Sequence, residues 1–113
     1  YVFAPFGFFL GLDPSEILLE GNLLGSKLVL NEFVAFQQLG GMISSMDYRT
    51  GMICAISLCG FANFSSLGIC VSGIAVLCPE KKSTLARLVF KAMLGGVAVS
   101  LIGAMVVGLV TLF

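Results

Sequence analysis

The stretch from Gly25 to Phe36 places ionisable and polar side chains in apolar surroundings. Lys27, Asn31 and Glu32 have these neighbours: Leu28, Val29, Leu30, Phe33, Val34, Ala35 and Phe36. An ionisable group is costly to bury in a membrane, so its presence in such a segment indicates a binding site for a polar ligand. Helical spacing puts Lys27 and Asn31 on one face, with Glu32 close by. Because the apolar residues surround the charges instead of forming one stripe, a ligand site is favoured. Two other interpretations stay open: Lys27 and Glu32 neutralise each other, or the segment is an amphipathic helix at the membrane surface.

A second candidate site lies between Ser57 and Ile69, inside an uncharged run from Thr50 to Pro79. The run is long enough to cross a bilayer, yet its centre is rich in small and polar residues: Gly60, Asn63, Ser65, Ser66 and Gly68. In hydrocarbon every backbone polar group needs a partner, so this composition suits a helix broken where it lines a cavity. A continuous helix whose small residues pack against neighbours is the alternative. If the helix is broken, we interpret this segment as a binding-site helix.

Helices must position these side chains. Residues 13–16, Asp-Pro-Ser-Glu, are typical of a helix start, with Asp13 as the cap. We expect a helix from Pro14 to about Leu24, a break at Gly25-Ser26, and a second helix from Lys27 to about Leu39. Each half is too short to span a bilayer, which favours a re-entrant hairpin.

The remaining segments complete a membrane architecture. We expect residues 1–12 to be the end of a preceding scaffold helix, 13–45 the re-entrant hairpin, 46–79 the discontinuous transmembrane helix, and 80–113 a loop and the last transmembrane helix. The last helix carries a small residue at every fourth position: Ala92, Gly96, Ser100, Ala104 and Gly108. We interpret this stripe as a surface that lets another helix approach closely.

Composition supports this class and excludes others. The chain is 58% hydrophobic and 11% charged, with a mean hydropathy of +1.09, which predicts an all-α integral membrane protein. Its net charge is zero, so nothing favours a nucleic-acid partner. It has no His, and its four cysteines form no Cys-x-x-Cys pair, so we assign no metal ligands and read the cysteines as small buried hydrophobes.

Two motifs resemble landmarks of one family. Residues 25–36, Gly-Ser-Lys-Leu-Val-Leu-Asn-Glu-Phe-Val-Ala-Phe, resemble the signature of the concentrative nucleoside transporters: Gly-x-Lys, three residues, then Asn-Glu-Phe-Val-Ala and an aromatic residue or Met. Residues 57–66, Ser-Leu-Cys-Gly-Phe-Ala-Asn-Phe-Ser-Ser, are similar to that family's second landmark. The similarity continues through residues 79–83 to the last helix, so it covers essentially the whole chain.

The resemblance implies a fold and a role for individual residues. It implies a transporter of two inverted repeats, assembled as a homotrimer, of which this chain is the second repeat with the N-terminal part missing. By position it implies that the ribose of a nucleoside is bound by Glu32, Phe61, Asn63 and Ser66. A carboxylate, an amide and a hydroxyl suit the sugar hydroxyls, and Phe61 would be an apolar wall.

The resemblance also implies a setting. We expect ion-coupled import (symport) of nucleosides by a multi-pass protein of the plasma membrane, the inner membrane of a bacterial cell, embedded in the lipid bilayer. The coupling ion, Na⁺ or H⁺, would bind outside this chain, and no cofactor or catalytic residue is expected. The alternatives are a channel or transporter for a different polar solute, an intramembrane hydrolase using Ser65 or Ser66 with Lys27 as the base, and a membrane scaffold subunit.

Overall fold

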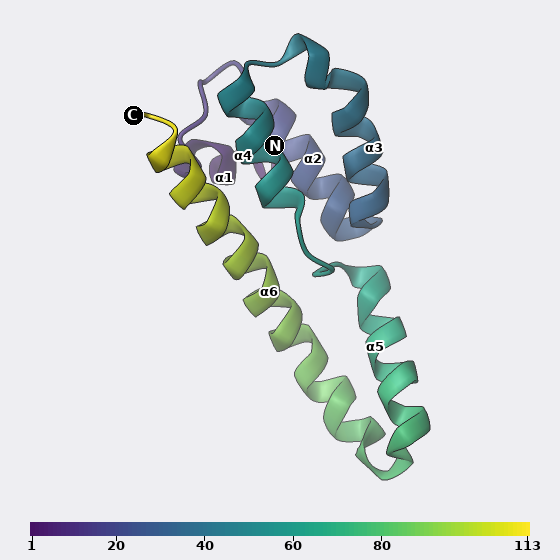
Figure 1. Ribbon diagram of the computed structural model, residues 1–113. Coiled ribbons are helices and arrows are strands. Elements are labelled where there is room, and N and C mark those ends of the chain that lie inside the picture. Colours follow the sequence, from purple (N-terminus) through teal and green to yellow (C-terminus); the bar gives the residue numbers. More distant parts are fainter.

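The structure is a computed structural model that describes residues 1–113. The chain is helical throughout and has no strand, which confirms the all-α prediction. Figure 1 shows α1 to α4 and the C-terminal part of α6 packed together, while α5 and the start of α6 extend from them as a two-helix leg. The elements are α1 (Ala4–Phe9), α2 (Ile17–Val29), α3 (Glu32–Met42), the 3₁₀ turn η1 (Ile43–Ser45), α4 (Tyr48–Leu58), α5 (Phe64–Leu77), the 3₁₀ turn η2 (Pro79–Lys81) and α6 (Lys82–Val110).

Helices α2 and α3 form a helical hairpin, but its break is not at Gly25-Ser26 as the sequence predicts. Helix α2 continues through these residues to Val29, and the chain turns at Leu30-Asn31. The other glycine of α2, Gly21, serves packing. A Cβ atom on Gly21 would lie 2.8 Å from the backbone nitrogen of Ala4, so this glycine lets α1 lie directly against α2.

The predicted cap at Asp13 is also wrong. The residue before the first turn of α2 is Glu16, and no side chain caps this helix. The Asp13 carbonyl accepts a hydrogen bond from the Glu16 backbone N–H at 2.8 Å, so residues 13–16 form a turn and the helix begins at Ile17. The Asp-Pro-Ser-Glu signal therefore marks the approach to the helix, not its first residue.

The uncharged run is a broken helix, so the alternative of a continuous helix is wrong. Helix α4 ends at Leu58 and α5 begins at Phe64. Between them Gly60 has a φ of +118°, a conformation that residues with a Cβ rarely adopt, and the Asn63 N–H donates to the Phe61 carbonyl at 3.1 Å. The break therefore lies where glycine and asparagine interrupt the apolar sequence.

Helix α6 packs along α4 and α5, and its small residues let other parts of the chain approach it closely. A Cβ atom on Gly108 would lie 2.6 Å from the carbonyl oxygen of Leu10, and one on Gly96 would lie 3.1 Å from Cβ of Ala62, while Ala104 is fully buried. The guanidinium of Arg49 on α4 donates to the carbonyls of Gly11, at 2.8 Å, and Gly108, at 2.9 Å. Because Gly11 precedes α2, this side chain ties three parts of the chain together.

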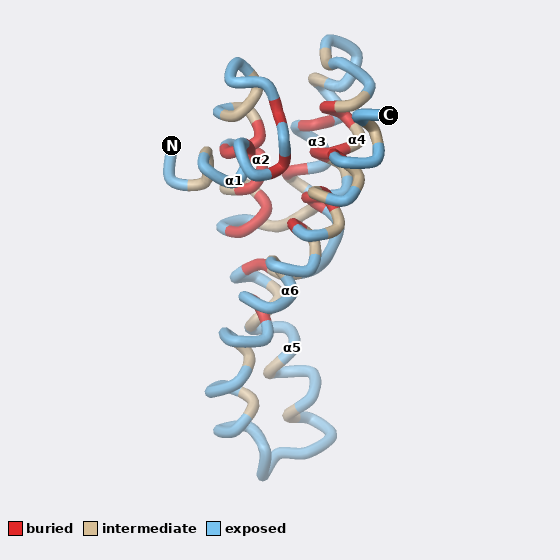
Figure 2. Tube along the Cα trace, turned by 90° about the vertical axis from the view of Figure 1, so that its left-hand side faces the viewer, coloured by how far each residue is buried: buried red, intermediate tan, exposed pale blue.

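The buried residues lie in one half of the molecule. Figure 2 shows them among α1 to α4 and the adjoining part of α6, whereas the leg is almost entirely exposed. Helix α5 has no buried residue although its sequence, Phe-Ser-Ser-Leu-Gly-Ile-Cys-Val-Ser-Gly-Ile-Ala-Val-Leu, is strongly apolar. The segment Pro79–Val110, 32 residues long, is the one helix with the length and composition to cross a membrane.

Candidate functional site

Glu32 is the first residue of α3, directly after the turn of the hairpin. Its neighbour Asn31 has an extended backbone and caps the helix, its Oδ1 accepting a hydrogen bond from the Val34 N–H at 2.9 Å. The side chain of Glu32 is half-buried and accepts a hydrogen bond from Nδ2 of Asn63. The cap therefore fixes where α3 starts, and with it the direction of the carboxylate.

Asn63 is the cap of α5 and is fully buried. Its Oδ1 accepts from the backbone N–H of Ser66 and from the Ser66 hydroxyl, both at 2.8 Å, while its amide nitrogen donates to Glu32. One side chain thus closes the helix end on one side and reaches the hairpin on the other. The structure brings together three of the four predicted site residues: Glu32, Asn63 and Ser66.

The Glu32 carboxylate lies where two helices begin. It belongs to the first turn of α3 and contacts the residue that caps α5. The N-terminus of a helix carries a partial positive charge and free backbone N–H groups, so it favours a nearby anion. Two such ends at one carboxylate lower the cost of keeping a charge at this half-buried position.

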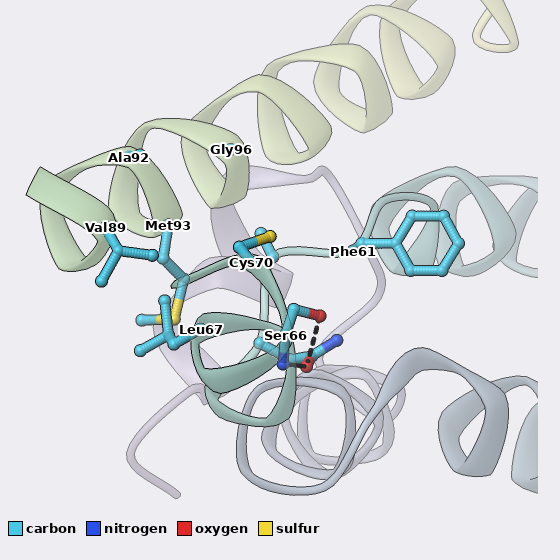
Figure 3. Close-up of a pocket in the computed structure, with 10 residues that line it drawn as sticks. Phe61, Ser66, Leu67, Cys70, Val89, Ala92, Met93 and Gly96 are labelled. Carbon is cyan, nitrogen blue, oxygen red and sulfur yellow. Dashed lines mark hydrogen bonds between the residues drawn. The ribbon is translucent and has the colours of Figure 1, made fainter. Parts of the chain in front are cut away.

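Phe61 contacts this cluster only through its backbone carbonyl, which accepts a hydrogen bond from the Asn63 N–H at 3.1 Å. It lies in the break between α4 and α5, its side chain is 78% exposed, and in Figure 3 its ring points away from Ser66. The pocket beside the cluster has a volume of about 240 Å³ and lies between α5 and α6. Phe61 lies at its edge. The other walls are mostly apolar and include Leu67, Cys70, Val89, Ala92 and Met93, with Asn63 and Ser66 as polar members.

Lys27 is buried and forms no salt bridge with Glu32. Its ammonium donates to the carbonyl of Ser57 at 2.8 Å and lies 3.1 Å from the hydroxyl oxygen of Ser100. The Ser57 hydroxyl in turn contacts a carboxylate oxygen of Glu20, which is fully buried.

The sequence analysis missed the two hydrogen-bond partners of Lys27, Ser57 and Ser100, and also Glu20, which contacts Ser57. A signal for one of them was present, since Glu20 lies seven residues before Lys27 and both therefore fall on one face of α2. The sequence pattern identifies Ser57 only as part of the broken helix and Ser100 only as a small residue of the α6 stripe. Nothing in the sequence links them to a lysine 30 and 73 residues away.

The structure is thus an all-helical fold with a polar cluster at a helix break. Residues 1–108 match the family described as "Na+ dependent nucleoside transporter C-terminus", and the chain belongs to that family. The resemblance seen in the two motifs is therefore confirmed, and the family consists of transporters and not of enzymes.

Individual relatives agree. The chain is 42% identical over 109 residues to the "Uncharacterized transporter YutK" of Bacillus subtilis, and 36% identical over 124 residues to "Sodium/nucleoside cotransporter 1" of Sus scrofa, with 96% of the chain covered in both. Among solved structures, CNTnw in an inward-facing substrate-bound state matches 99% of the chain with a TM-score of 0.94 and 32% identity. The chain spans 27%, 19% and 28% of these three proteins respectively, so it corresponds to about a quarter of such a transporter.

Proposed function

We propose that the chain forms the ribose-binding side of an ion-coupled nucleoside importer. The observation that carries this proposal is the hydrogen-bonded cluster of Glu32, Asn63 and Ser66, formed where the hairpin meets the broken helix. Its three functional groups are a carboxylate, an amide and a hydroxyl, and all belong to motifs that resemble the family's landmarks. The matched relatives, whose printed names include a sodium/nucleoside cotransporter, support nucleosides as the substrate class.

The cluster has free capacity for a sugar. An ionised carboxylate offers about four acceptor positions on its two oxygens, and Asn63 uses one of them on Glu32. Two neighbouring ribose hydroxyls can donate to the remaining positions, and such charge-assisted hydrogen bonds are stronger than neutral ones. The hydroxyl of Ser66 donates to Asn63, so its oxygen remains free to accept. A nucleoside without these hydroxyls leaves the remaining acceptor positions of the carboxylate unpaired, which costs about 1–3 kcal/mol.

The surroundings suit a membrane setting. We place the α2–α3 hairpin as a re-entrant segment, α4 and α5 as one interrupted crossing, and α6 as a second crossing about 44 Å long at about 1.5 Å per residue. Helix α5 has no buried residue within this chain, and its apolar side chains would be covered by lipid and by the rest of the transporter. Irregular backbone at this depth is tolerated where it lines a cavity, as residues 59–63 would.

The remaining features of the proposal follow the family. The protein is placed in the plasma membrane, which is the inner membrane in a bacterial cell, and assembles as a homotrimer. Na⁺ or H⁺ drives uptake from a site outside this chain, and movement of the domain that holds the cluster carries the nucleoside across.

The test uses the full-length transporter in lipid nanodiscs and measures the Kd of uridine and of 2′,3′-dideoxyuridine. Ser66→Ala and Asn63→Ser each weaken uridine binding, by about tenfold for a buried polar group left unpaired. In both variants the Kd of uridine and the Kd of the dideoxy analogue differ less than in the parent. Asn63→Ser retains a capping hydroxyl for α5, so the loss reports the amide and not the helix end.

The control is Ser65→Ala, because Ser65 precedes Ser66 but its side chain is exposed. We expect Ser65→Ala to leave the Kd of uridine and the Kd of 2′,3′-dideoxyuridine unchanged. Equal affinity of the parent for uridine and the dideoxy analogue would contradict a ribose site, and absence of any nucleoside binding would favour the alternative of a different polar solute. Uptake into liposomes under a Na⁺ gradient and separately under an H⁺ gradient names the coupling ion.

A further inference from the structure

Lys27 joins three helices at a single buried point. Its side chain is 1% exposed, and its ammonium contacts the Ser57 carbonyl of α4 at 2.8 Å and the Ser100 hydroxyl oxygen of α6 at 3.1 Å. The lysine itself belongs to the last turns of α2. Both contacts are inside the protein, and neither Lys27 nor Glu20 lines the pocket beside Asn63. Lys27 is therefore placed to hold helices and not to contact a solute.

Ser57 is held from α2 through both of its polar groups. Its carbonyl accepts from Lys27, while its hydroxyl contacts Glu20 and also lies 2.8 Å from the Cys54 carbonyl. Glu20 and Lys27 are seven residues apart, two turns of α2, and so present opposite charges to the same turn of α4. Ser57 thus bridges a positive and a negative group that do not touch each other.

A bridge of buried charges is an expensive way to join helices. Taking two charged groups out of water costs several kcal/mol each, and apolar side chains of similar volume often give equal or better stability. The second Glu20 oxygen, Oε2, is buried without any partner, so the network is not arranged for the greatest stability. A buried polar contact does have one property that apolar packing lacks, since it is satisfied in only one register.

The Lys27–Ser57 contact fixes the same two chain segments that form the cluster of Glu32, Asn63 and Ser66. Lys27 lies five residues before Glu32, and Ser57 lies six residues before Asn63. The Lys27–Ser57 and Glu32–Asn63 contacts therefore join the same two segments, one just before the turn of the hairpin and the other across the break. Because Ser57 is next to the last residue of α4, a shift there moves the start of the break that leads to Asn63.

We propose that Lys27, balanced by Glu20 through Ser57, is a positioning residue that sets the distance between Glu32 and Asn63 and thereby the affinity for the sugar. This inference rests on the proposed function, since it acts through the same cluster. Lys27 touches no substrate, and its effect reaches the ligand only through the placement of Asn63.

A double-mutant cycle separates this role from a general effect on stability. The Kd of uridine is measured for the full-length transporter and for Lys27→Met, Asn63→Ser and the double variant. We expect Lys27→Met to weaken binding about tenfold in the parent, and to add less than about twofold once Asn63 is replaced, because Lys27 acts through the Glu32–Asn63 contact that Asn63→Ser already removes. A loss of stability unrelated to the cluster would weaken binding equally in both backgrounds.

The same double-mutant cycle is measured with Ser100→Ala in place of Lys27→Met. This substitution removes one partner of the Lys27 ammonium and leaves the Ser57 contact in place. It gives a smaller loss in the same direction, about threefold, that also vanishes in the Asn63→Ser background. If Lys27→Met does not yield folded transporter, the Ser100→Ala cycle decides the question. Lys91→Met, at an exposed lysine of α6, is the control and leaves the Kd unchanged.

Each outcome counts for or against one of the two proposals. If Asn63→Ser leaves uridine binding intact, the proposed ribose site is wrong. If Asn63→Ser weakens binding while Lys27→Met and Ser100→Ala do not, or if their effects multiply with it, the ribose site stands and the positioning role of Lys27 is overturned.

Discussion

Asn31 and Asn63 hold the same position on two different helices, and these helices meet at their first turns. Each asparagine has an extended backbone, and each Oδ1 accepts from the backbone N–H three residues later, at 2.9 Å from Val34 and 2.8 Å from Ser66. Asn63 then donates to Glu32, which follows Asn31 directly. The site is therefore a junction of two capped helix ends, with the carboxylate of one end bonded to the cap of the other.

The cap at Asn31 can be tested separately from ligand binding. We expect Asn31→Ala to destabilise the full-length transporter by about 1 kcal/mol, because the Val34 N–H loses its only side-chain partner. Asn31→Asp keeps the acceptor and should retain most of the stability. The thermal unfolding midpoint of the purified protein in detergent measures both. Equal midpoints for Asn31→Ala and the parent would show that the cap contributes nothing.

The negative charge of Glu32 is expected to contribute to nucleoside binding. Glu32→Gln keeps one acceptor oxygen for the Asn63 amide but removes the negative charge offered to the sugar. We expect the Kd of uridine to rise about ten- to a hundredfold, as for the loss of about 1.5–3 kcal/mol of a charge-assisted hydrogen bond. Isothermal titration of the full-length transporter measures it. Glu80→Gln, in the exposed turn before α6, is the matched control, and a similar loss in that variant would point to a long-range effect of charge.

The break in the hairpin shows why glycine is an ambiguous signal. The Gly25-Ser26 pair predicts a helix end, but α2 continues through both residues, and it is Gly21, one turn earlier, that lies directly against the backbone of Ala4. Whether a glycine ends a helix or admits a neighbour depends on what packs beside it, which local sequence does not reveal. The break instead lies at Asn31, whose side chain can cap, and in the uncharged run it likewise lies at Asn63.

Some residues of the candidate site could be predicted from the sequence, and others could not. Glu32, Asn63 and Ser66 were identified from polar residues in apolar segments and from their motifs, and the structure brings them together. The partners of Lys27 could not be identified, because their contacts depend on how α2, α4 and α6 pack. Sequence patterns locate polar residues within single helices, whereas contacts between helices require the tertiary structure.

The close approach of α1 and α2 gives a prediction on packing. A methyl group on Gly21 would lie 2.8 Å from the backbone nitrogen and 2.9 Å from Cα of Ala4, and backbone atoms cannot move aside easily. We expect Gly21→Ala to destabilise the protein by about 1–3 kcal/mol despite the higher helix propensity of alanine. Gly95→Ala on α6 is the control, because a Cβ there meets no atom of this chain. Unfolding midpoints in detergent compare the two, and an unchanged midpoint for Gly21→Ala would contradict the packing.

Phe61 gives the last prediction, because the structure separates its effects on stability and on binding. Its side chain is 78% exposed and its ring points away from Ser66, so Phe61→Ala should change the free energy of unfolding by less than about 0.5 kcal/mol. As the proposed apolar wall of the nucleoside site it should still contribute about 0.5–1.5 kcal/mol to binding, a two- to tenfold rise in the Kd of uridine. Phe64→Ala is the matched control: its ring lies 6.4 Å from that of Phe90, so its loss should lower the unfolding midpoint with little change in Kd. A lower midpoint for Phe61→Ala with an unchanged Kd would assign Phe61 to packing against the rest of the transporter instead of to the nucleoside.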